Sequence, residues 1–229
     1  MLALSLMVVG VTATAHGPFA HVDAFQGLVV AQMFLVMTAL SSLTMAAVLR
    51  ELVSRHELER RLRALALTDN LTGLANRRLL FERIDHASQR LSRTPGRLAL
   101  LFIDLDHFKE LNDALGHASG DAVLIEVARR LRAVVRNHDT VARLGGDEFL
   151  VLVEDFNGSA HVEALAERVI RAVSEPIPCP GGVAHIGASI GYAVISEPIE
   201  EAETFVAAAD RAMYTAKREG GGRAFAAPA

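Results

Sequence analysis

The spacing of charged residues divides the chain into an apolar front end and a mixed remainder. Between Met1 and Leu49 the only charged side chain is that of Asp23. Residues 28–49 form a run of 22 positions without a charge. A helix of this length, rising about 1.5 Å per residue, crosses a hydrocarbon core of about 30 Å. The run predicts a membrane-spanning helix. A buried helix of a soluble protein is the alternative, although such a helix is rarely apolar on all sides.

The residues after this run predict its orientation. Five arginines follow it: Arg50, Arg55, Arg60, Arg61 and Arg63. Basic residues concentrate on the cytoplasmic side of a span, so the rest of the chain is expected in the cytoplasm.

A shorter apolar stretch opens the chain at residues 1–15. It is either the apolar part of a signal peptide, with Ala13-Thr14-Ala15 as the cleavage site, or the first helix of a hairpin whose outer turn covers residues 17–27. This stretch has no basic residues at its start, whereas a signal peptide normally begins with basic residues. We therefore favour the hairpin and expect one or two transmembrane helices within residues 1–49.

Residues 50–68 are expected to form a helical linker. Leu58, Leu62 and Leu65 are spaced by four and three positions, and charged residues fill the other faces. This pattern is compatible with a short parallel coiled coil between two protomers. Because fewer than three complete heptads are present, a solvated amphipathic connector is the alternative.

From residue 69 onward, apolar runs of strand length alternate with segments of helical period, which predicts one domain over 69–229. The expected helices are 77–91, 107–115, 121–136, 162–173 and 203–218, and the expected strands are 98–105, 140–144, 148–153 and 183–195. Gly145-Gly146-Asp147 separates two of these strands and is typical of a tight β-hairpin. The alternation, together with one hairpin, indicates an α/β fold with a mixed sheet flanked by helices.

Three carboxylates fall at the ends of predicted strands. Asp104 ends the strand at 98–105, and Asp147 and Glu148 stand at the tip of the hairpin. If these strands are neighbours, the acids meet at one edge of the sheet, where their repulsion favours a bound cation. Oxygen ligands without cysteine or paired histidine favour Mg²⁺. For each acid taken alone, a plain surface role is the alternative.

Composition removes several classes of function. The net charge is −4, from 23 basic and 27 acidic residues, and the chain has no Trp, so a nucleic-acid partner is not expected. A hydrophobic share of 51% excludes a disordered chain, and a single cysteine, Cys179, excludes a disulfide scaffold. The only lysines are Lys109 and Lys217.

Four motifs along the domain resemble those of the GGDEF diguanylate cyclase family. In chain order they are residues 69–78 (DNLTGLANRR), 102–121 (FIDLDHFKELNDALGHASGD), 143–149 (RLGGDEF) and 209–217 (ADRAMYTAK). The resemblance implies a GGDEF fold of the nucleotidyl-cyclase, palm-like type. The apolar helix and the preceding loop 17–27 resemble the last part of the multi-helix membrane sensor domains that precede GGDEF modules. This places the chain in the bacterial inner membrane, with its catalytic domain in the cytoplasm.

The resemblance also implies a reaction. Two GTP molecules condense to cyclic di-GMP with release of two pyrophosphates, in a homodimer in which each 3′-hydroxyl attacks the α-phosphorus of the other GTP. Asp104, the backbone carbonyl of Leu105 and Asp147 would bind Mg²⁺, with Mn²⁺ as an alternative ion. Asp147 is the implied base for the 3′-hydroxyl, and Glu148 would help to hold a second metal ion.

Contacts with GTP follow from the same resemblance. Backbone N–H groups around Phe108 and Lys109 would cradle the phosphates, and the side chains of Lys109 and Lys217 would bind them. Asn112 and Asp121 match the residues that read guanine. Without the resemblance, Asn112 would be a helix-surface residue and Asp121 the N-cap of the helix that follows it.

Residues 136–139 (RNHD) lie at the offset where the family carries its inhibitory RxxD site. Arg136 would bind guanine or phosphate of the product, and Asp139 would pair with guanine N–H groups. Arg168 is a weaker candidate for a contact in the same inhibited assembly. A surface ion pair of little value is the alternative for Arg136 and Asp139.

One position departs from the family, and two other functions compete. Gly221 stands where many members have Arg, so phosphate affinity is lowered unless Arg223 replaces it. The main rival function is a catalytically silent GGDEF module that binds cyclic di-GMP through Arg136 and Asp139, but the intact set of catalytic residues argues against it. A cyclase that makes a mononucleotide is disfavoured by the GGDEF hairpin.

Overall fold

The computed structural model describes residues 24–156, 158–220 and 224–226. The chain divides into two compact units, Met1–Arg63 and Ala64–Ala229. The expected first helix and the cleavage site, both within residues 1–15, lie outside the described residues. The choice between a helical hairpin and a signal peptide therefore stays a prediction.

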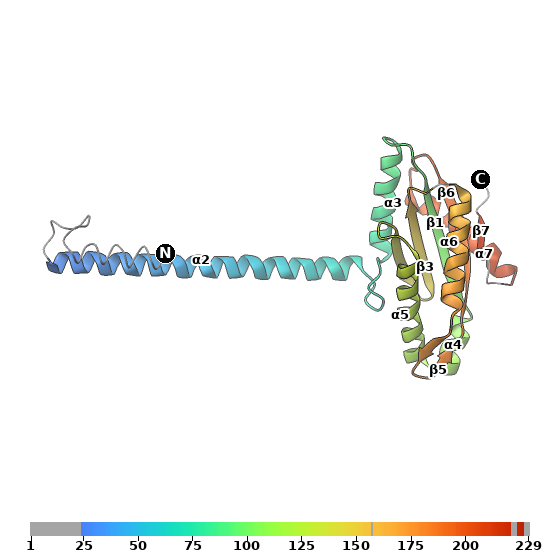
Figure 1. Cartoon of the computed structure of the whole chain (residues 1–229), viewed down its shortest axis with the longest axis horizontal. Helices are drawn as coiled ribbons and strands as arrows, with labels where there is room; N and C mark the ends of the chain where they lie inside the picture. The colour runs from blue at the N-terminus through green and yellow to red at the C-terminus, as the bar shows by residue number, and fades with distance from the viewer. Residues whose placement is uncertain (1–23, 157, 221–223, 227–229) are drawn as a thin grey trace. The chain divides into compact units, whose positions relative to one another are not determined.

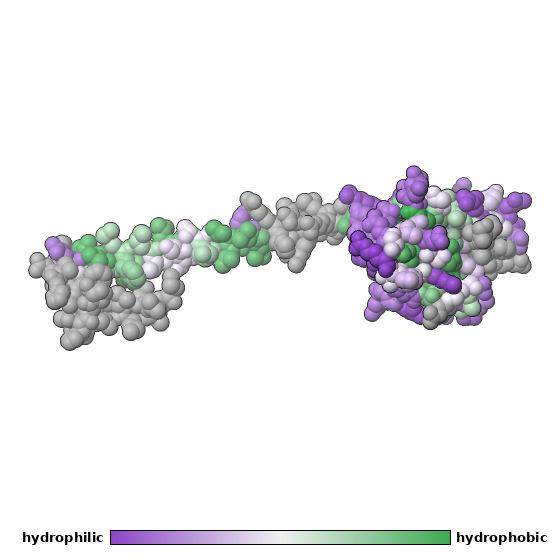
Figure 2. Space-filling view, turned by 90° about the horizontal axis from the view of Figure 1, so that it is seen from above, coloured by the Kyte–Doolittle hydropathy of each residue, from purple (hydrophilic) through white to green (hydrophobic). Residues whose placement is uncertain are grey.

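The described part of the N-terminal unit is helical: it belongs to one long helix, α2 (Ala24–Leu67), of 44 residues, whose last four residues fall in the C-terminal unit. Its part Gln26–Val53 has the length and composition of a membrane span, with a mean hydropathy of 1.9. Figure 2 shows apolar side chains along the visible face of this part. The hydroxyls of Thr38, Ser42 and Thr44 donate to carbonyls three or four residues earlier, so these polar groups are satisfied within the helix.

The expected linker helix is the continuation of α2, which runs unbroken to Leu67. The side chains of Leu58, Leu62 and Leu65 lie outside the described part of the structure. The coiled coil between protomers therefore stays a prediction.

A five-stranded sheet in the order β2-β3-β1-β6-β7 forms the centre of the C-terminal unit (Figure 1). Its strands are β1 (Leu98–Asp106), β2 (Thr140–Gly145), β3 (Glu148–Glu154), β6 (Gly187–Ile195) and β7 (Ala224–Ala226). β7 runs parallel to β6, and the other neighbouring strands are antiparallel. The predicted mixed sheet and the predicted hairpin at Gly145 and Gly146 are thus confirmed.

Alternating side chains on β1 separate two cores. Leu101 and Ile103 face a core shared with α5 and α6, whereas Leu100 and Phe102 face a core shared with α3 and α7. Side chains two residues apart on a strand point to the same face. Asp104 therefore projects on the face covered by α3 and α7, just beyond the apolar part of that core.

Five described helices flank this sheet: α3 (Arg77–Leu91), α4 (Phe108–Leu115), α5 (His117–Val134), α6 (Ser159–Ser174) and α7 (Ala202–Arg218). The predicted start of α5 at Asp121 is wrong, because the helix begins four residues earlier. Gly116, with φ of 83°, both ends α4 and precedes α5, a conformation that glycine adopts without strain. Asp121 lies inside α5, so the N-cap interpretation of this residue is also wrong.

The predicted single strand at 183–195 is two strands, β5 (Gly182–Ala184) and β6, which His185 and Ile186 connect. β5 pairs with an additional short strand, β4 (Ile177–Cys179), in a separate two-stranded sheet. Prolines at 176, 178 and 180 obscure the alternation that would have indicated β4.

Candidate active site

Three carboxylates meet where β1 ends and β3 begins, at what we call the acidic edge: Asp104, Asp147 and Glu148. The β1–β3 register pairs Asp104 with Glu148, and Asp147 precedes Glu148 in the turn. The backbone N–H of Leu105 donates to the carbonyl of Asp147 over 3.3 Å. The structure therefore brings the three acids, and the Leu105 backbone, to one edge of the sheet.

The glycine turn before these acids is held by Arg143. Its Nε and Nη2 donate to the carbonyl of Gly146 at 3.0 and 2.8 Å, and its Nη1 lies 3.1 and 3.2 Å from the two carboxylate oxygens of Asp69. Gly145 and Gly146 have φ of 151° and 53°, which favour glycine. Arg143 thus connects the turn that follows α2 to the turn that carries Asp147.

Arg143 and Asp69 lie within two of the motifs, but no role was predicted for either residue. Burial raises the pKa of Asp69, but hydrogen bonds from Thr72 and the charge of Arg143 outweigh burial and hold that pKa below its usual value. The only indication of a role in the sequence was that each residue occupies a position within a family motif. Nothing in the sequence pairs two residues that lie 74 positions apart.

Lys217 on α7 is the cation at the acidic edge. Its Nζ lies 2.6 Å from Asp104 Oδ1. Burial lowers the pKa of Lys217, but the hydrogen bond to Asp104 and the charges of Asp104, Asp147 and Asp106 outweigh it, so the pKa is raised overall. Lys217 is therefore charged and partly balances the acids.

The positive charge of Lys217 does not fully neutralise the acids of the acidic edge. Burial raises the pKa of Asp104 above its usual value; the hydrogen bond from Lys217 opposes this effect and the charge of Asp147 adds to it. Burial also raises the pKa of Glu148, helped by the charges of Asp104, Asp147 and Asp210. The acidic edge therefore carries more negative charge than Lys217 neutralises.

This excess charge fits a divalent cation. Among the described residues, no group of three or more His, Cys, Asp or Glu side chains is placed to hold a metal ion. The implied ligand set needs only two such side chains, Asp104 and Asp147, together with the carbonyl of Leu105. These are oxygen donors, which suit Mg²⁺ better than a softer metal. GGDEF cyclases as a family use Mg²⁺.

The expected phosphate cradle lies at the start of α4. His107 precedes the helix with φ of 60°, and its own side chain makes no capping hydrogen bond. The side chain of Phe108 is buried in the core, so only its backbone can contact a ligand, whereas the side chain of Lys109 is exposed. The N–H groups of a first helical turn are suited to bind phosphate.

The α4–α5 turn places one expected guanine-reading residue, Asn112, against the residue that precedes the other, Asp121. The amide of Asn112 lies against the backbone of Gly120, and the exposed Asp121 follows Gly120 in the helix. Within the described part of the chain, Asn112 Oδ1 is buried without a hydrogen-bond donor. A buried acceptor without a donor is costly, and a ligand with N–H groups would remove that cost.

The RxxD turn, residues 136–139, is closed by its own aspartate. Asp139 accepts hydrogen bonds from the backbone N–H groups of Arg136 at 2.9 Å and Glu154 at 3.5 Å, and its side chain is 2% exposed. The Arg136 side chain is exposed. Arg168, on α6, donates to the carbonyl of Val134 at 2.7 Å, two residues before the turn.

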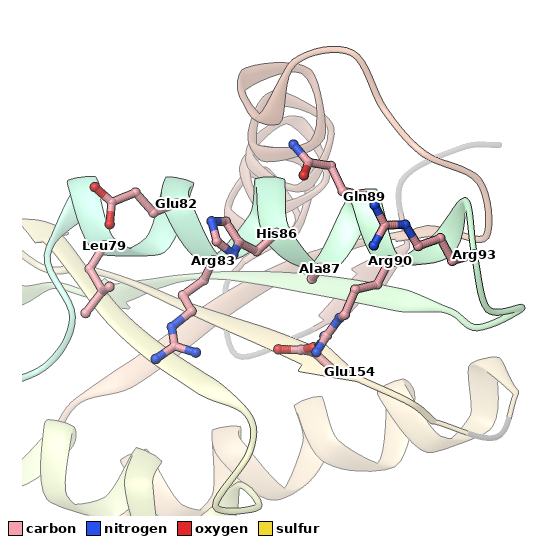
Figure 3. A pocket seen from close by; sticks show the side chains of 9 residues that line it. All are labelled: Leu79, Glu82, Arg83, His86, Ala87, Gln89, Arg90, Arg93 and Glu154. Carbon is pink, nitrogen blue, oxygen red and sulfur yellow. Dashed lines mark ion pairs between the residues drawn. The ribbon is translucent and has the colours of Figure 1, made fainter.

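Two adjoining cavities of about 550 and 560 Å³ lie between α3 and the neighbouring strands, and the second extends to the RxxD turn. Arg83 and Arg90 line both of them. Figure 3 shows these two side chains directed from α3 toward the sheet, with the Arg90 guanidinium against Glu154, its ion-pair partner. No binding role was predicted for Arg83 and Arg90, although their spacing of seven residues places them on one face of a helix.

Comparisons with known proteins identify the family of the chain. The family described as "Diguanylate cyclase, GGDEF domain" matches residues 66–223. The chain is 47% identical over 161 residues to the bifunctional diguanylate cyclase/cyclic di-GMP phosphodiesterase MucR of Pseudomonas aeruginosa, which covers 70% of this chain and 23% of MucR. It spans well under half the length of this curated relative. Because the family match begins at residue 66, the resemblance of the front end to a sensor domain is supported only by one apolar helix.

Two solved structures are also similar. The GGDEF domain of TpbB (YfiN) from Pseudomonas aeruginosa has a TM-score of 0.67 and 40% identity, covering 70% of this chain and 94% of that chain. The coiled coil and GGDEF domain of DgcB from Caulobacter crescentus, in complex with c-di-GMP, has a TM-score of 0.75 and 29% identity, covering 81% and 98%. Sequence and fold together show that the chain belongs to the GGDEF diguanylate cyclase family.

Proposed function

We propose that this chain is a diguanylate cyclase, which condenses two GTP molecules to cyclic di-GMP and two pyrophosphates in a membrane-tethered homodimer. The observation that carries the proposal is the pairing of Asp104 with Glu148 at the acidic edge, with Lys217 bound to Asp104. Buried like charges cost stability, and they are explained when a site must hold a cation and a polyphosphate.

The chain's own residues would bind and orient GTP. Asp104, the Leu105 carbonyl and Asp147 would hold Mg²⁺, with Mn²⁺ as the alternative and Glu148 helping with a second ion. When bound, the metal neutralises the triphosphate and stabilises the pyrophosphate leaving group. Lys109, and Lys217 once it leaves Asp104, would contact phosphate oxygens as compact charges.

Each half-reaction forms one bond and breaks one. The 3′-oxygen of one GTP bonds to the α-phosphorus of the other, the bond from that phosphorus to the bridging oxygen breaks, and pyrophosphate leaves. Asp147 would accept the proton of the 3′-hydroxyl. Two such steps close the ring. Because each protomer would hold one GTP, the reaction requires two protomers facing each other.

Asn112 and Asp121 would select guanine. A carboxylate can accept the N1–H and N2–H groups of guanine, a pattern that adenine lacks. A site built to pair with such groups rejects a base without them, because its own polar atoms would be left unpaired.

Cyclic di-GMP would inhibit the enzyme at the RxxD turn, through Arg136 and Asp139 with Arg168 as a further contact. The arginine-lined cavities beside the turn support this proposal, because guanidinium groups bind guanine O6/N7 and phosphate. The Asp139 carboxylate is held by two backbone N–H groups, so binding of the product would require this turn to rearrange.

Helix α2 would anchor the protein in the bacterial inner membrane. Its apolar part is long enough to span, and the arginines after it favour a cytoplasmic location for the C-terminal unit. Membrane tethering would also confine protomers to a plane, which raises the rate at which two loaded sites meet.

The decisive experiment is product analysis by mass. The 229-residue chain in detergent is incubated with GTP and Mg²⁺ over a range of concentrations, with a phosphodiesterase removing cyclic di-GMP as its linear product. We expect linear di-GMP from the wild type and none from Asp147→Ala. The matched control is Asp85→Ala, which removes an exposed carboxylate from α3.

Other results of this experiment would support one of the rival functions. A cyclic mononucleotide as the product would indicate a mononucleotide cyclase. No product at any concentration, together with cyclic di-GMP binding that Arg136→Ala abolishes, would contradict the enzyme proposal and leave a silent receptor.

A further inference from the structure

We propose that Gly120 is a positioning residue for guanine selection: the missing side chain at this position lets the amide of Asn112 lie against α5, one residue before Asp121. The inference rests on the proposed function, because it assumes that Asn112 and Asp121 read guanine. It adds a residue that touches neither guanine nor phosphate and acts through Asn112.

The contact leaves no room for a side chain at position 120 while the Asn112 amide stays in place. A Cβ built on Gly120 would overlap Asn112 Oδ1, and it would lie 2.8 Å from Cγ and 3.2 Å from Nδ2 of the same side chain. All three nearest atoms thus belong to one side-chain amide. Backbone strain does not require glycine here, because Gly120 is within the helix and has no positive φ.

The two helices cannot separate easily to make room. Ser119, 1% exposed, donates to the carbonyl of Leu115 at 2.9 Å and accepts from the N–H of Gly181 at 3.0 Å. The turn between β4 and β5 therefore packs directly on the α4–α5 connection, where a Cβ on Gly181 would lie 2.9 Å from the Leu115 carbonyl. These contacts fix the end of α4 relative to the start of α5.

The part that can move is the side chain of Asn112. No described donor reaches its buried Oδ1, so that oxygen loses no hydrogen bond when the amide rotates away. Alanine also favours a helix interior more than glycine does. Gly120→Ala is therefore expected to fold, but with the Asn112 amide displaced from its place against α5.

The test is a comparison of two nucleotides that cannot be condensed, 3′-deoxy-GTP and 3′-deoxy-ATP. Their dissociation constants are measured by calorimetry in Mg²⁺ for the full 229-residue chain in detergent. Gly120→Ala should bind 3′-deoxy-GTP about 10- to 100-fold more weakly, as expected for the loss of base-reading contacts. Binding of 3′-deoxy-ATP should change by less than about twofold. A general structural defect would weaken both nucleotides.

A double-mutant cycle supplies the control. In an Asn112→Ala background the three atoms nearest to the new Cβ are gone, so adding Gly120→Ala should have no further effect on either nucleotide. Equal losses for both nucleotides, additive losses, or unchanged binding by Gly120→Ala would each overturn the proposal. Unfolding of both variants that carry Gly120→Ala would also overturn it, because the new Cβ would then collide with something other than Asn112.

A result that contradicts the proposed function can be distinguished from one that contradicts the role of Gly120. If the wild type forms no cyclic di-GMP from GTP, the cyclase assignment is wrong whatever Gly120 does. If the wild type forms cyclic di-GMP and Gly120→Ala keeps its guanine preference, only the role of Gly120 is wrong. A wild type that binds both deoxynucleotides equally overturns the role of Gly120 and the guanine-reading role of Asn112 together.

Discussion

The acidic edge and the RxxD turn both hold buried carboxylates, but their surroundings are opposite. At the acidic edge, burial and neighbouring acids raise the pKa values of Asp104 and Glu148. In the RxxD turn, two backbone N–H groups donate to the carboxylate of Asp139. The ionised acids of the edge therefore cost folding stability, whereas Asp139 contributes to it.

This difference indicates which site is open to a ligand. The acidic edge gains stability from any cation that enters, and Lys217 supplies only part of the required charge. The RxxD turn is satisfied without a ligand, so a ligand there must compete with bonds that already exist. Mg²⁺ should therefore affect variants of the edge and leave variants of the turn unchanged.

The largest expected effect is on catalysis at the edge. Asp104→Asn removes one implied metal ligand while keeping the shape of the side chain. The initial rate of cyclic di-GMP formation should fall by at least about 10³-fold, because the metal would no longer be held against the triphosphate. A rate within about tenfold of the wild type would show that Asp104 does not serve the metal.

The acidic edge could be predicted because its acids flank apolar runs: Asp104 lies near the end of one run, and Asp147 and Glu148 directly precede another. β1 and β3 are recognisable from sequence, and an antiparallel neighbour of β1 places Glu148 opposite Asp104. Helix α3 was likewise predicted with its observed ends, because its apolar positions repeat with a helical period. Local patterning was sufficient for these elements.

Other parts of the site depend on contacts that a local pattern does not contain. The start of α5 was misplaced because residues 117–120 lack an apolar period and are fixed by the packing of Ser119 instead. The bond between Arg143 and Asp69, and the ion pair between Arg90 and Glu154, join residues far apart in the chain. Their pairing is decided by how the helices pack on the sheet.

The next largest effect is on stability at the RxxD turn. Asp139→Ala leaves two backbone N–H groups without their acceptor and should lower the free energy of unfolding by about 1–2 kcal/mol. Hydrogen exchange of amides in β1 and β3 measures this loss in the full chain. Asn137→Ala, an exposed residue of the same turn, is the control and should change little. Rescue of Asp139→Ala by Mg²⁺ would contradict the comparison.

A smaller loss is expected when the edge loses its lysine. Lys217→Met removes the cation 2.6 Å from Asp104 and should lower the free energy of unfolding by about 1 kcal/mol, since the lysine is partly exposed and screened. Mg²⁺ should stabilise this variant more than the wild type, because the lysine no longer competes for Asp104. Lys217→Arg keeps the charge and should behave like the wild type in the absence of Mg²⁺. Equal stabilisation of Lys217→Met and wild type by Mg²⁺ would show that Lys217 and the metal do not share Asp104.

The smallest expected effect is a gain in stability, not a loss, and it concerns Glu148. Glu148 has a pKa raised above its usual value of 4.5, so its ionised form destabilises the folded state at pH 7. As the pH falls through the raised value, the folded chain takes up the proton before the unfolded chain does, and the wild type gains stability. Glu148→Gln carries no such charge and should be more stable than the wild type at pH 7 by about 0.5 kcal/mol or less, because solvent screens this half-buried group. The advantage should shrink as the pH falls toward 4.5, which hydrogen exchange at several pH values would measure. If Glu148→Gln were less stable than the wild type at pH 7, then Glu148 would be satisfied by its surroundings, as Asp139 is, and the contrast between the two sites would be lost.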